Sequence, residues 1–253
     1  MRVIRYIILI CLSLSVVAAS CGRPHVGADD ARKAKGYYEL AVASMNGGDA
    51  TGALNELLKA VEINPYDPDI HNALGLVYYS NEKYTKAISH FQKAIELDPQ
   101  HSDAHHNLGH LYLTQGRYDL ATAEFQQALE NDLYRNRAQT LNALGYTYYK
   151  KRDYLKAEET LKGCIEHDRL YFLAYDNLAK VYIALERYDD ARPILEQALQ
   201  MQPLFPEAML DLGLVYWKIN KKNQAVDLFK RVKQIDPLGE FGARADEYLG
   251  LLE

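Results

Sequence analysis

Apolar positions recur along most of the chain with a period of 34 residues, beginning near Ala34. The segment 68–101 shows the pattern most clearly. Its repeated positions are Leu74, Gly75 and Tyr78 in the first half, then Tyr84, Ala87, Phe91 and Ala94 in the second half, and Pro99 near the end. Apart from the adjacent Leu74 and Gly75, neighbouring positions within each half are three or four residues apart, so they share one face of a helix. Each period is therefore predicted to form two amphipathic helices joined by a short turn.

A leucine followed by a small residue occurs in every period. These pairs are Leu40 and Ala41, Leu74 and Gly75, Leu108 and Gly109, Leu144 and Gly145, Leu178 and Ala179, and Leu212 and Gly213. They define six repeats, at 34–67, 68–101, 102–135, 138–171, 172–205 and 206–239, with two residues inserted before the fourth. The pattern resembles the tetratricopeptide repeat, for which a period of 34 residues is diagnostic. This resemblance implies an all-α fold, a right-handed superhelical solenoid of six helix pairs.

The two ends of the array and its middle differ from the regular pattern. The segment 240–253 places Phe241, Ala245, Tyr248, Leu249 and Leu252 on one helical face. Such a face can cover the open end of the last repeat, so we expect a C-terminal capping helix. The closing proline is absent from the third and fourth repeats, where Leu133 and Arg169 stand. The middle of the array is therefore predicted to be irregular.

Nine of the twenty tyrosines fall at two repeat positions where the tetratricopeptide family packs an aromatic side chain. They are Tyr78, Tyr112, Tyr148, Tyr182 and Tyr216, then Tyr84, Tyr118, Tyr154 and Tyr188. The stretch "NALGYTYYKK", from Asn142 to Lys151, contains both kinds of tyrosine. Tyr148 is predicted to pack between helices, whereas Tyr146 and Tyr149 fall on a different face of the same helix.

In tetratricopeptide arrays that other face lines a concave groove. The predicted groove residues are Tyr38, Leu76, Tyr79, His106, His110, Leu113, Tyr146, Tyr149, Lys180, Ile183, Leu210, Leu214 and Trp217. Most are apolar or aromatic, and an exposed surface of this kind usually binds a partner. Alternatively, the superhelical curvature, the capping helix or the N-terminal linker covers part of it. The lysine, arginine and asparagine clamp by which some members of the family bind carboxylates is missing from the first three repeats.

The N-terminal residues 1–20 differ in composition from the rest of the chain. Arg2 and Arg5 precede the apolar run "YIILICLSLSVV", which ends in small residues before Cys21, the pattern of a secretory signal peptide. The segment 18–21 resembles the bacterial lipobox, which implies that Cys21 is lipidated and becomes the new N-terminus. Gly22, in place of aspartate, favours sorting to the outer membrane by the same resemblance. We expect residues 21–33 to be a lipidated linker, with the membrane contacted only through the lipid.

Charge and cysteine content argue against a nucleic-acid-binding protein and against a fold held by internal disulfides. Signal removal takes two arginines and changes the formal net charge from −5 to −7, which does not favour nucleic acid as a partner. Of the three cysteines, Cys11 leaves with the signal peptide and Cys21 carries the lipid. Cys164 then has no partner for an internal disulfide, and it stands at a position where the repeat packs a small alanine. We therefore interpret Cys164 as a buried packing residue.

The strongest candidates for chemistry are four histidines, His101, His105, His106 and His110. Two pairs among them have the four-residue helical spacing that can chelate zinc. No HExxH motif is present, however, and only His106 and His110 are predicted to face the groove. Nucleophile elbows, phosphate loops and dinucleotide fingerprints are also absent from the sequence. We expect no cofactor and no enzyme activity, and a metal-dependent enzyme is the least favoured alternative.

A lipidated N-terminus followed by six tetratricopeptide repeats resembles the PilF/PilW/Tgl family of type IV pilus pilotins. The resemblance covers the whole chain, although the repeats themselves report only the scaffold. It implies a protein client, a secretin subunit, and a location on the periplasmic face of the bacterial outer membrane. An envelope adaptor that docks peptidoglycan enzymes is a second hypothesis of the same class.

Overall fold

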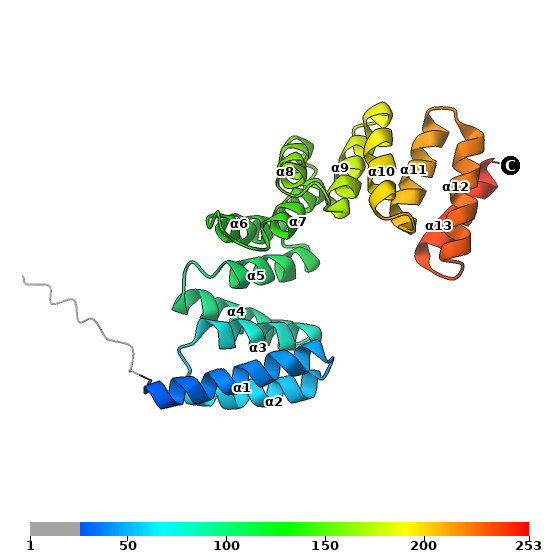
Figure 1. The fold of residues 1–253 in the computed structure, drawn as a ribbon. Helices are drawn as coiled ribbons and strands as arrows, with labels where there is room; N and C mark the ends of the chain where they lie inside the picture. The colour runs from blue at the N-terminus through cyan, green and yellow to red at the C-terminus, as the bar shows by residue number, and fades with distance from the viewer. Residues whose placement is uncertain (1–25, 253) are drawn as a thin grey trace, which may run out of the picture.

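The computed structural model describes residues 26–252, which form thirteen α-helices and no β-strand (Figure 1). The first six helices are α1 (Ala28–Asn46), α2 (Ala50–Ile63), α3 (Pro68–Ser80), α4 (Tyr84–Leu97), α5 (Ser102–Thr114) and α6 (Tyr118–Leu129). The remaining helices are α7 (Arg137–Lys150), α8 (Tyr154–His167), α9 (Phe172–Ala184), α10 (Tyr188–Met201), α11 (Pro206–Lys218), α12 (Lys222–Ile235) and α13 (Glu240–Leu252). The predicted all-α solenoid is confirmed.

The helices form a curved array in which each helix packs on the next. Every odd-numbered helix also contacts the next odd-numbered helix, whereas no two even-numbered helices between residues 26 and 252 are in contact. The odd side of the array is therefore the short, concave side, and Figure 1 shows the arch that results. None of the helices in this range is long and apolar enough to cross a membrane.

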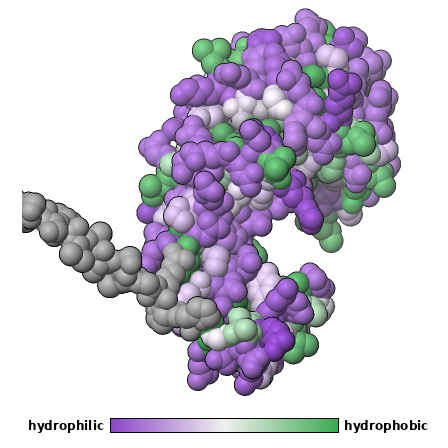
Figure 2. Space-filling view, turned by 60° about the vertical axis from the view of Figure 1, so that its left-hand side comes forward, coloured by the Kyte–Doolittle hydropathy of each residue, from purple (hydrophilic) through white to green (hydrophobic). Residues whose placement is uncertain are grey.

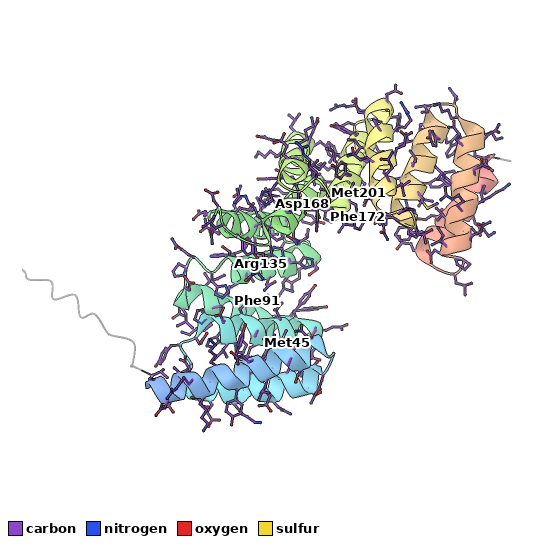
Figure 3. The ribbon with its side chains drawn as sticks, in the orientation of Figure 1. Met45, Phe91, Arg135, Asp168, Phe172 and Met201 are labelled. Atoms are coloured by element: carbon purple, nitrogen blue, oxygen red, sulfur yellow. The ribbon has the colours of Figure 1, made fainter. Side chains whose placement is uncertain are left out.

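Small residues are required where the two helices of a pair cross. A Cβ atom added to Gly75 would lie 2.4 Å from Cε1 of Phe91, which Figure 3 marks within the second helix pair. The same addition at Gly213 would lie 2.5 Å from Cε1 of Phe229. Carbon atoms do not approach this closely, so a larger residue would force the two helices apart. The sequence pattern of glycine and alanine thus reports the close helix crossing directly.

The turn inside each helix pair contains one residue with a left-handed backbone. These residues are Gly48, Glu82, Gly116, Arg152, Glu186 and Asn220, with φ values between 57° and 78°. Only two are glycine, the residue that adopts this conformation without steric cost. The four other turns therefore carry a small local strain that the surrounding helix pairs maintain.

The first helix begins earlier than the sequence pattern indicates. Helix α1 starts at Ala28, inside the segment 21–33 that we expected to be a linker. Leu40 also departs from its counterparts, because it is 57% exposed whereas Leu74 is fully buried. Leu74 is covered by the preceding helix pair, and among the described residues no helix pair precedes α1. The N-terminal end of the array therefore leaves an apolar side chain uncovered.

The irregular middle and the C-terminal end are each held by specific contacts. Between α6 and α7, the buried Tyr134 donates a hydrogen bond from Oη to Asp103 Oδ1 at 2.7 Å. At the C-terminal end, α13 packs on α11 and α12. The ring of Tyr248 lies 5.0 Å from the ring of Phe229 and 6.0 Å from that of Trp217. Helix α13 thus closes the array as the pattern of residues 240–253 predicts.

Candidate binding groove

The groove is the concave surface of helices α1, α3, α5, α7, α9 and α11, and the predicted residues lie along it. Those that are half-buried are Tyr38, Leu76, Tyr79, His106, Leu113, Tyr146, Tyr149, Lys180, Ile183, Leu214 and Trp217, while His110 is exposed. The space-filling view shows hydrophobic residues scattered over a mostly hydrophilic surface and a hollow between the N-terminal helix pairs and the rest of the arch (Figure 2). The groove is therefore open to a partner along most of its length.

Leu210 is the exception, and its prediction as a groove residue is wrong. Its side chain is fully buried, as is Ala245, which lies 35 residues further along on α13. Helix α13 contacts α11 where a seventh repeat would otherwise continue the array. The capping helix therefore covers the end of the groove. Trp217, at the same end, is also partly covered by the ring of Tyr248.

Aromatic side chains of the groove contact one another in two clusters. In the N-terminal part, the ring of Tyr79 lies 6.2 Å from the ring of His110, edge to face, across α3 and α5. In the middle, the rings of Tyr146 and Tyr149 stack at 6.0 Å. Such ring pairs are favourable beyond the apolar area that they bury. The two clusters are suited to anchoring apolar side chains of a partner.

Tyr148 has the structural role that the sequence predicts for it. Its side chain is 7% exposed and packs between helices, and its Oη accepts a hydrogen bond of 3.1 Å from Gln126 Nε2 on α6. Its neighbours Tyr146 and Tyr149 are only half-buried. The three tyrosines of one short stretch therefore divide between the core and the groove according to helical face.

The four histidines do not converge on one point. His101 Nε2 lies 3.1 Å from Asp69 Oδ1, and His105 Nδ1 lies 2.6 Å from Glu124 Oε2. His106 Nδ1 lies 2.7 Å from Thr140 Oγ1, and burial lowers the pKa of His106 to about 4. Among residues 26–252, no group of three or more potential ligands is arranged to hold a metal ion. Each histidine thus has a partner or ring contact of its own within the array.

A polar network in the C-terminal part of the groove was not predicted from the sequence. Lys180 Nζ donates hydrogen bonds of 2.6 Å to Asp176 Oδ2 and to Glu207 Oε1. Burial alone would lower the pKa of Lys180, but the two carboxylates raise it, so the amine stays protonated. These three residues line a groove hollow of about 730 Å³ together with His110, Leu113 and Tyr146. The prediction from groove positions identified Lys180 and did not foresee its pairing with the two carboxylates.

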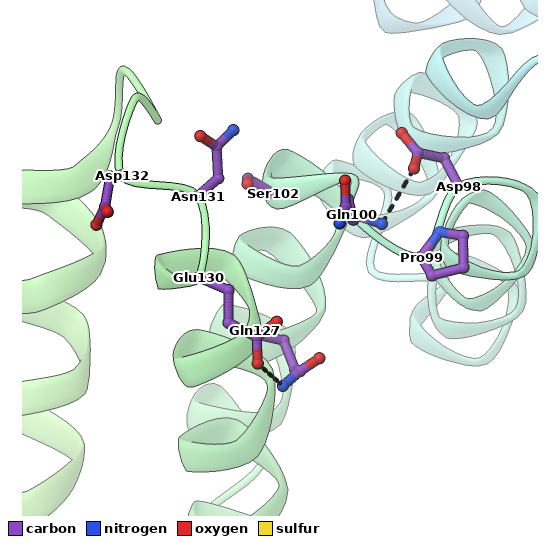
Figure 4. Close-up of a pocket in the computed structure, with 8 residues that line it drawn as sticks. All are labelled: Asp98, Pro99, Gln100, Ser102, Gln127, Glu130, Asn131 and Asp132. Atoms are coloured by element: carbon purple, nitrogen blue, oxygen red, sulfur yellow. Dashed lines mark hydrogen bonds between the residues drawn. The ribbon is translucent and has the colours of Figure 1, made fainter.

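A second hollow, of about 540 Å³, lies outside the groove, beside the loops that follow α4 and α6 (Figure 4). Two pairs of its polar groups bond to one another, because Asp98 Oδ1 accepts from the Gln100 N–H and Gln127 Nε2 donates to Glu130 Oε1, whereas the buried Ser102 Oγ has no hydrogen-bond partner. The thiol of Cys164 is not a reactive site either. It is fully buried, its Sγ donates to the Ala138 carbonyl at 3.1 Å, and burial raises the pKa of its thiol to about 12. Such a thiol is inert at neutral pH.

Cys21 and the predicted signal peptide, residues 1–20, lie outside the described residues 26–252. Lipidation therefore stays a prediction.

Comparisons with known proteins agree with this architecture. Family models described as TPR repeat or tetratricopeptide repeat match residues 43–82, 77–116, 102–133, 136–204 and 177–240. Response regulator aspartate phosphatase E of Bacillus subtilis is 35% identical over 82 residues, which are 30% of this chain and 21% of that protein. The uncharacterized protein ycf37 of Cyanophora paradoxa is 26% identical over 118 residues, or 44% of this chain and 69% of that one. The chain thus spans about a fifth of the first of these relatives.

Solved structures resemble the chain over more of its length. PilF of Pseudomonas aeruginosa has a TM-score of 0.79 at 20% identity, covering 88% of this chain and 99% of that one. PilW, described as a widely conserved type IV pilus biogenesis factor, has a TM-score of 0.78 at 18% identity, covering 85% and 98%. YrrB, described as a TPR protein with an unusual peptide-binding site, has a TM-score of 0.59 at 19% identity, covering 76% and 97%. With these repeat matches and this helix-pair array, the chain belongs to the tetratricopeptide-repeat proteins.

Proposed function

We propose that this protein is a lipid-anchored scaffold that binds a client protein in its concave groove, and that the client is a secretin subunit of a type IV pilus. The single observation that carries the client-binding role is the open groove with its two aromatic clusters on α3, α5 and α7. A tetratricopeptide array that exposes such a surface is suited to binding an extended or helical segment of another protein.

One further observation and one prediction from the sequence support the identity of the client. The array matches PilF and PilW over nearly the whole of those chains, and PilW is described as a type IV pilus biogenesis factor. The predicted lipidation of Cys21 would keep the groove beside the outer membrane. A groove that covers apolar surface of a secretin subunit at the membrane would assist assembly of the ring.

The client is tested by deleting the gene in its native bacterium. We expect heat-resistant secretin multimers to be depleted while secretin monomer remains, as judged by electrophoresis and immunoblotting of outer-membrane fractions. Normal multimers combined with mislocalised peptidoglycan enzymes would instead support the envelope adaptor.

The anchor is tested with Cys21→Ser. We expect this variant to incorporate no labelled palmitate and to leave the outer-membrane fraction. Continued acylation of the variant would show that the lipobox assignment is wrong.

The groove is tested by comparing three tyrosine variants of one helix. Tyr146→Ala and Tyr149→Ala should weaken capture of the purified secretin subunit, because losing one aromatic anchor can cost about 2 kcal/mol of binding energy. Both variants should melt close to the unmodified protein. Tyr148→Ala is the matched control, and it should lower the melting temperature instead. If the two groove variants melt normally and still capture the secretin, the partner binds elsewhere on the array.

A further inference from the structure

A hydrogen-bonded bridge between neighbouring repeats recurs along the floor of the groove. Asn107 Nδ2 on α5 donates to Asn72 Oδ1 on α3 at 2.9 Å. Asn177 Nδ2 on α9 donates to Asn142 Oδ1 on α7 at 2.8 Å. In both bridges the donor lies 35 residues after the acceptor, at the next residue position of the following repeat. Each bridge satisfies two half-buried amides and carries no charge.

The same pair of positions at the junction of α9 and α11 carries two carboxyl groups. Asp211 stands 35 residues after Asp176, at the positions where the two bridged junctions have asparagine. Neither side chain can donate a hydrogen bond to the other when both are ionised. Asp176 is 2% exposed, and its Oδ1 atom has no hydrogen-bond partner. Asp211 is 8% exposed, and its carboxyl group makes no hydrogen bond in the structure.

Negative charge therefore exceeds positive charge at this junction. The charged groups that act on Asp211 are Asp176 and Lys180 on α9, Glu207 on its own helix, and Arg244 on α13. Three carboxyl groups thus face two cations. Burial and the charge of Asp176 raise the pKa of Asp211 to about 7. One further positive group would balance the cluster and satisfy the oxygen atoms that have no donor.

We propose that the Asp176 and Asp211 pair is a binding site for one arginine or lysine side chain of a protein partner that lies in the groove. This inference rests on the proposed client-binding function and specifies one residue type that the client must present. Asp176 lines the groove hollow of about 730 Å³ together with Lys180 and Glu207, which places this member of the pair at the concave surface. A guanidinium group suits it best, because its five N–H donors can serve two carboxylates at once.

Two other occupants fit the site less well. A divalent metal ion needs several convergent oxygen ligands, but the ammonium group of Lys180 already lies 2.6 Å from both Asp176 and Glu207. A shared proton would bring the charge of the cluster to zero, but it supplies only one hydrogen-bond donor to a pair in which Asp176 Oδ1 and both oxygen atoms of Asp211 lack one. A long basic side chain brings both the charge and the donors, with its apolar stem against Tyr146 and Leu113.

The test uses the purified full-length chain and a phage-displayed library of random peptides. The unmodified protein should select peptides enriched in arginine or lysine. Asp211→Asn, which introduces the residue found at the two bridged junctions, should lose this enrichment. Asn107→Ala is the matched control, because it breaks a neutral bridge in the same groove and should keep the enrichment. A single selected basic peptide should bind Asp211→Asn about tenfold or more weakly, as measured by calorimetry. Its affinity for the unmodified protein should rise from about pH 6 to about pH 8, as Asp211 loses its proton.

The outcomes separate this inference from the proposed function. Selected peptides that lack basic residues, or an enrichment that persists in Asp211→Asn, would overturn the basic-residue site and leave the groove proposal intact. Tight binding of calcium that Asp211→Asn abolishes would also overturn it. If no peptide binds, or if all peptides bind the doubly substituted Tyr146→Ala and Tyr149→Ala protein unchanged, the groove proposal itself fails.

Discussion

The two ends of the groove share one backbone geometry and differ in chemistry. At the junction of α3 and α5, Asn72 and Asn107 form a neutral bridge beside Tyr79 and His110. At the junction of α9 and α11, the equivalent positions are Asp176 and Asp211, beside Lys180 and Glu207. The repeats fix where a side chain stands, and the residue at that place decides what it can bind. A solenoid can therefore change its ligand along its length without changing its fold.

The largest effects should be equal in the two regions, because both rest on the same helix crossing. Phe91→Ala, at the N-terminal end, and Phe229→Ala, at the C-terminal end, each remove a ring that packs against a glycine. We expect each to lower the free energy of unfolding by about 3–5 kcal/mol in urea titrations. A much smaller loss at one end would mean that the two ends are not built on the same framework.

Exchanging the bridge residues should affect the two regions in opposite directions. A raised pKa means that the folded state favours protonated Asp211, so stability falls as the pH rises from about 4 to about 7. Asp211→Asn should therefore raise the free energy of unfolding at about pH 8, on the order of 2–4 kcal/mol, and change it much less near pH 4. Asn107→Asp, the reverse exchange at the other junction, should lower it at about pH 8. Chemical denaturation at both pH values checks the signs, and an unchanged Asp211→Asn profile would contradict the charge imbalance.

Lowering the pH should destabilise mainly the region around α4 and α5. Burial lowers the pKa of His90 and of His106 to about 4, so the folded state favours the neutral rings. Their contribution to stability is present above about pH 6.5 and is lost as the pH falls towards 4. His106→Gln should reduce the acid-induced loss between these values by about 1–2 kcal/mol. Hydrogen exchange at about pH 5 should show α5 opening before α11. The opposite order would contradict the predicted difference between the two regions.

The smallest effects concern the turns, where the two regions should again behave alike. Glu82 and Glu186 have positive φ values of 58° and 57°, which cost less in glycine. Glu82→Gly and Glu186→Gly should each raise the free energy of unfolding by up to about 1 kcal/mol in thermal and urea melts. Gly116→Ala is the control in the reverse direction, and it should be destabilising. Destabilisation by both glycine variants would show that other contacts of the glutamates outweigh the backbone strain.

Much of the binding surface follows from sequence periodicity, because a helical face is a local property. The spacing in "NALGYTYYKK" separates buried Tyr148 from half-buried Tyr146 and Tyr149. The carboxyl pair was missed because Asp176 and Asp211 become meaningful only when adjacent repeats are aligned. The two asparagine bridges, each spanning 35 residues, are the signal in the sequence that could have revealed it. The residue type at one position gives no information on the charge of the residue that lies beside it in the next repeat.

The sequence by itself determined the helices, their pairing and the close crossings. A period of 34 residues with glycine or alanine at each helix crossing permits few other ways of packing the helices. Only the tertiary structure decided what happens where a repeat lacks a neighbour. Leu40 is exposed at the N-terminal end, whereas Leu212, at the equivalent repeat position, is buried on α11, which α13 covers. Equivalent repeat positions have different burial because burial depends on the helices that lie next to a residue in space, and the end repeats lack the neighbours that the inner repeats have.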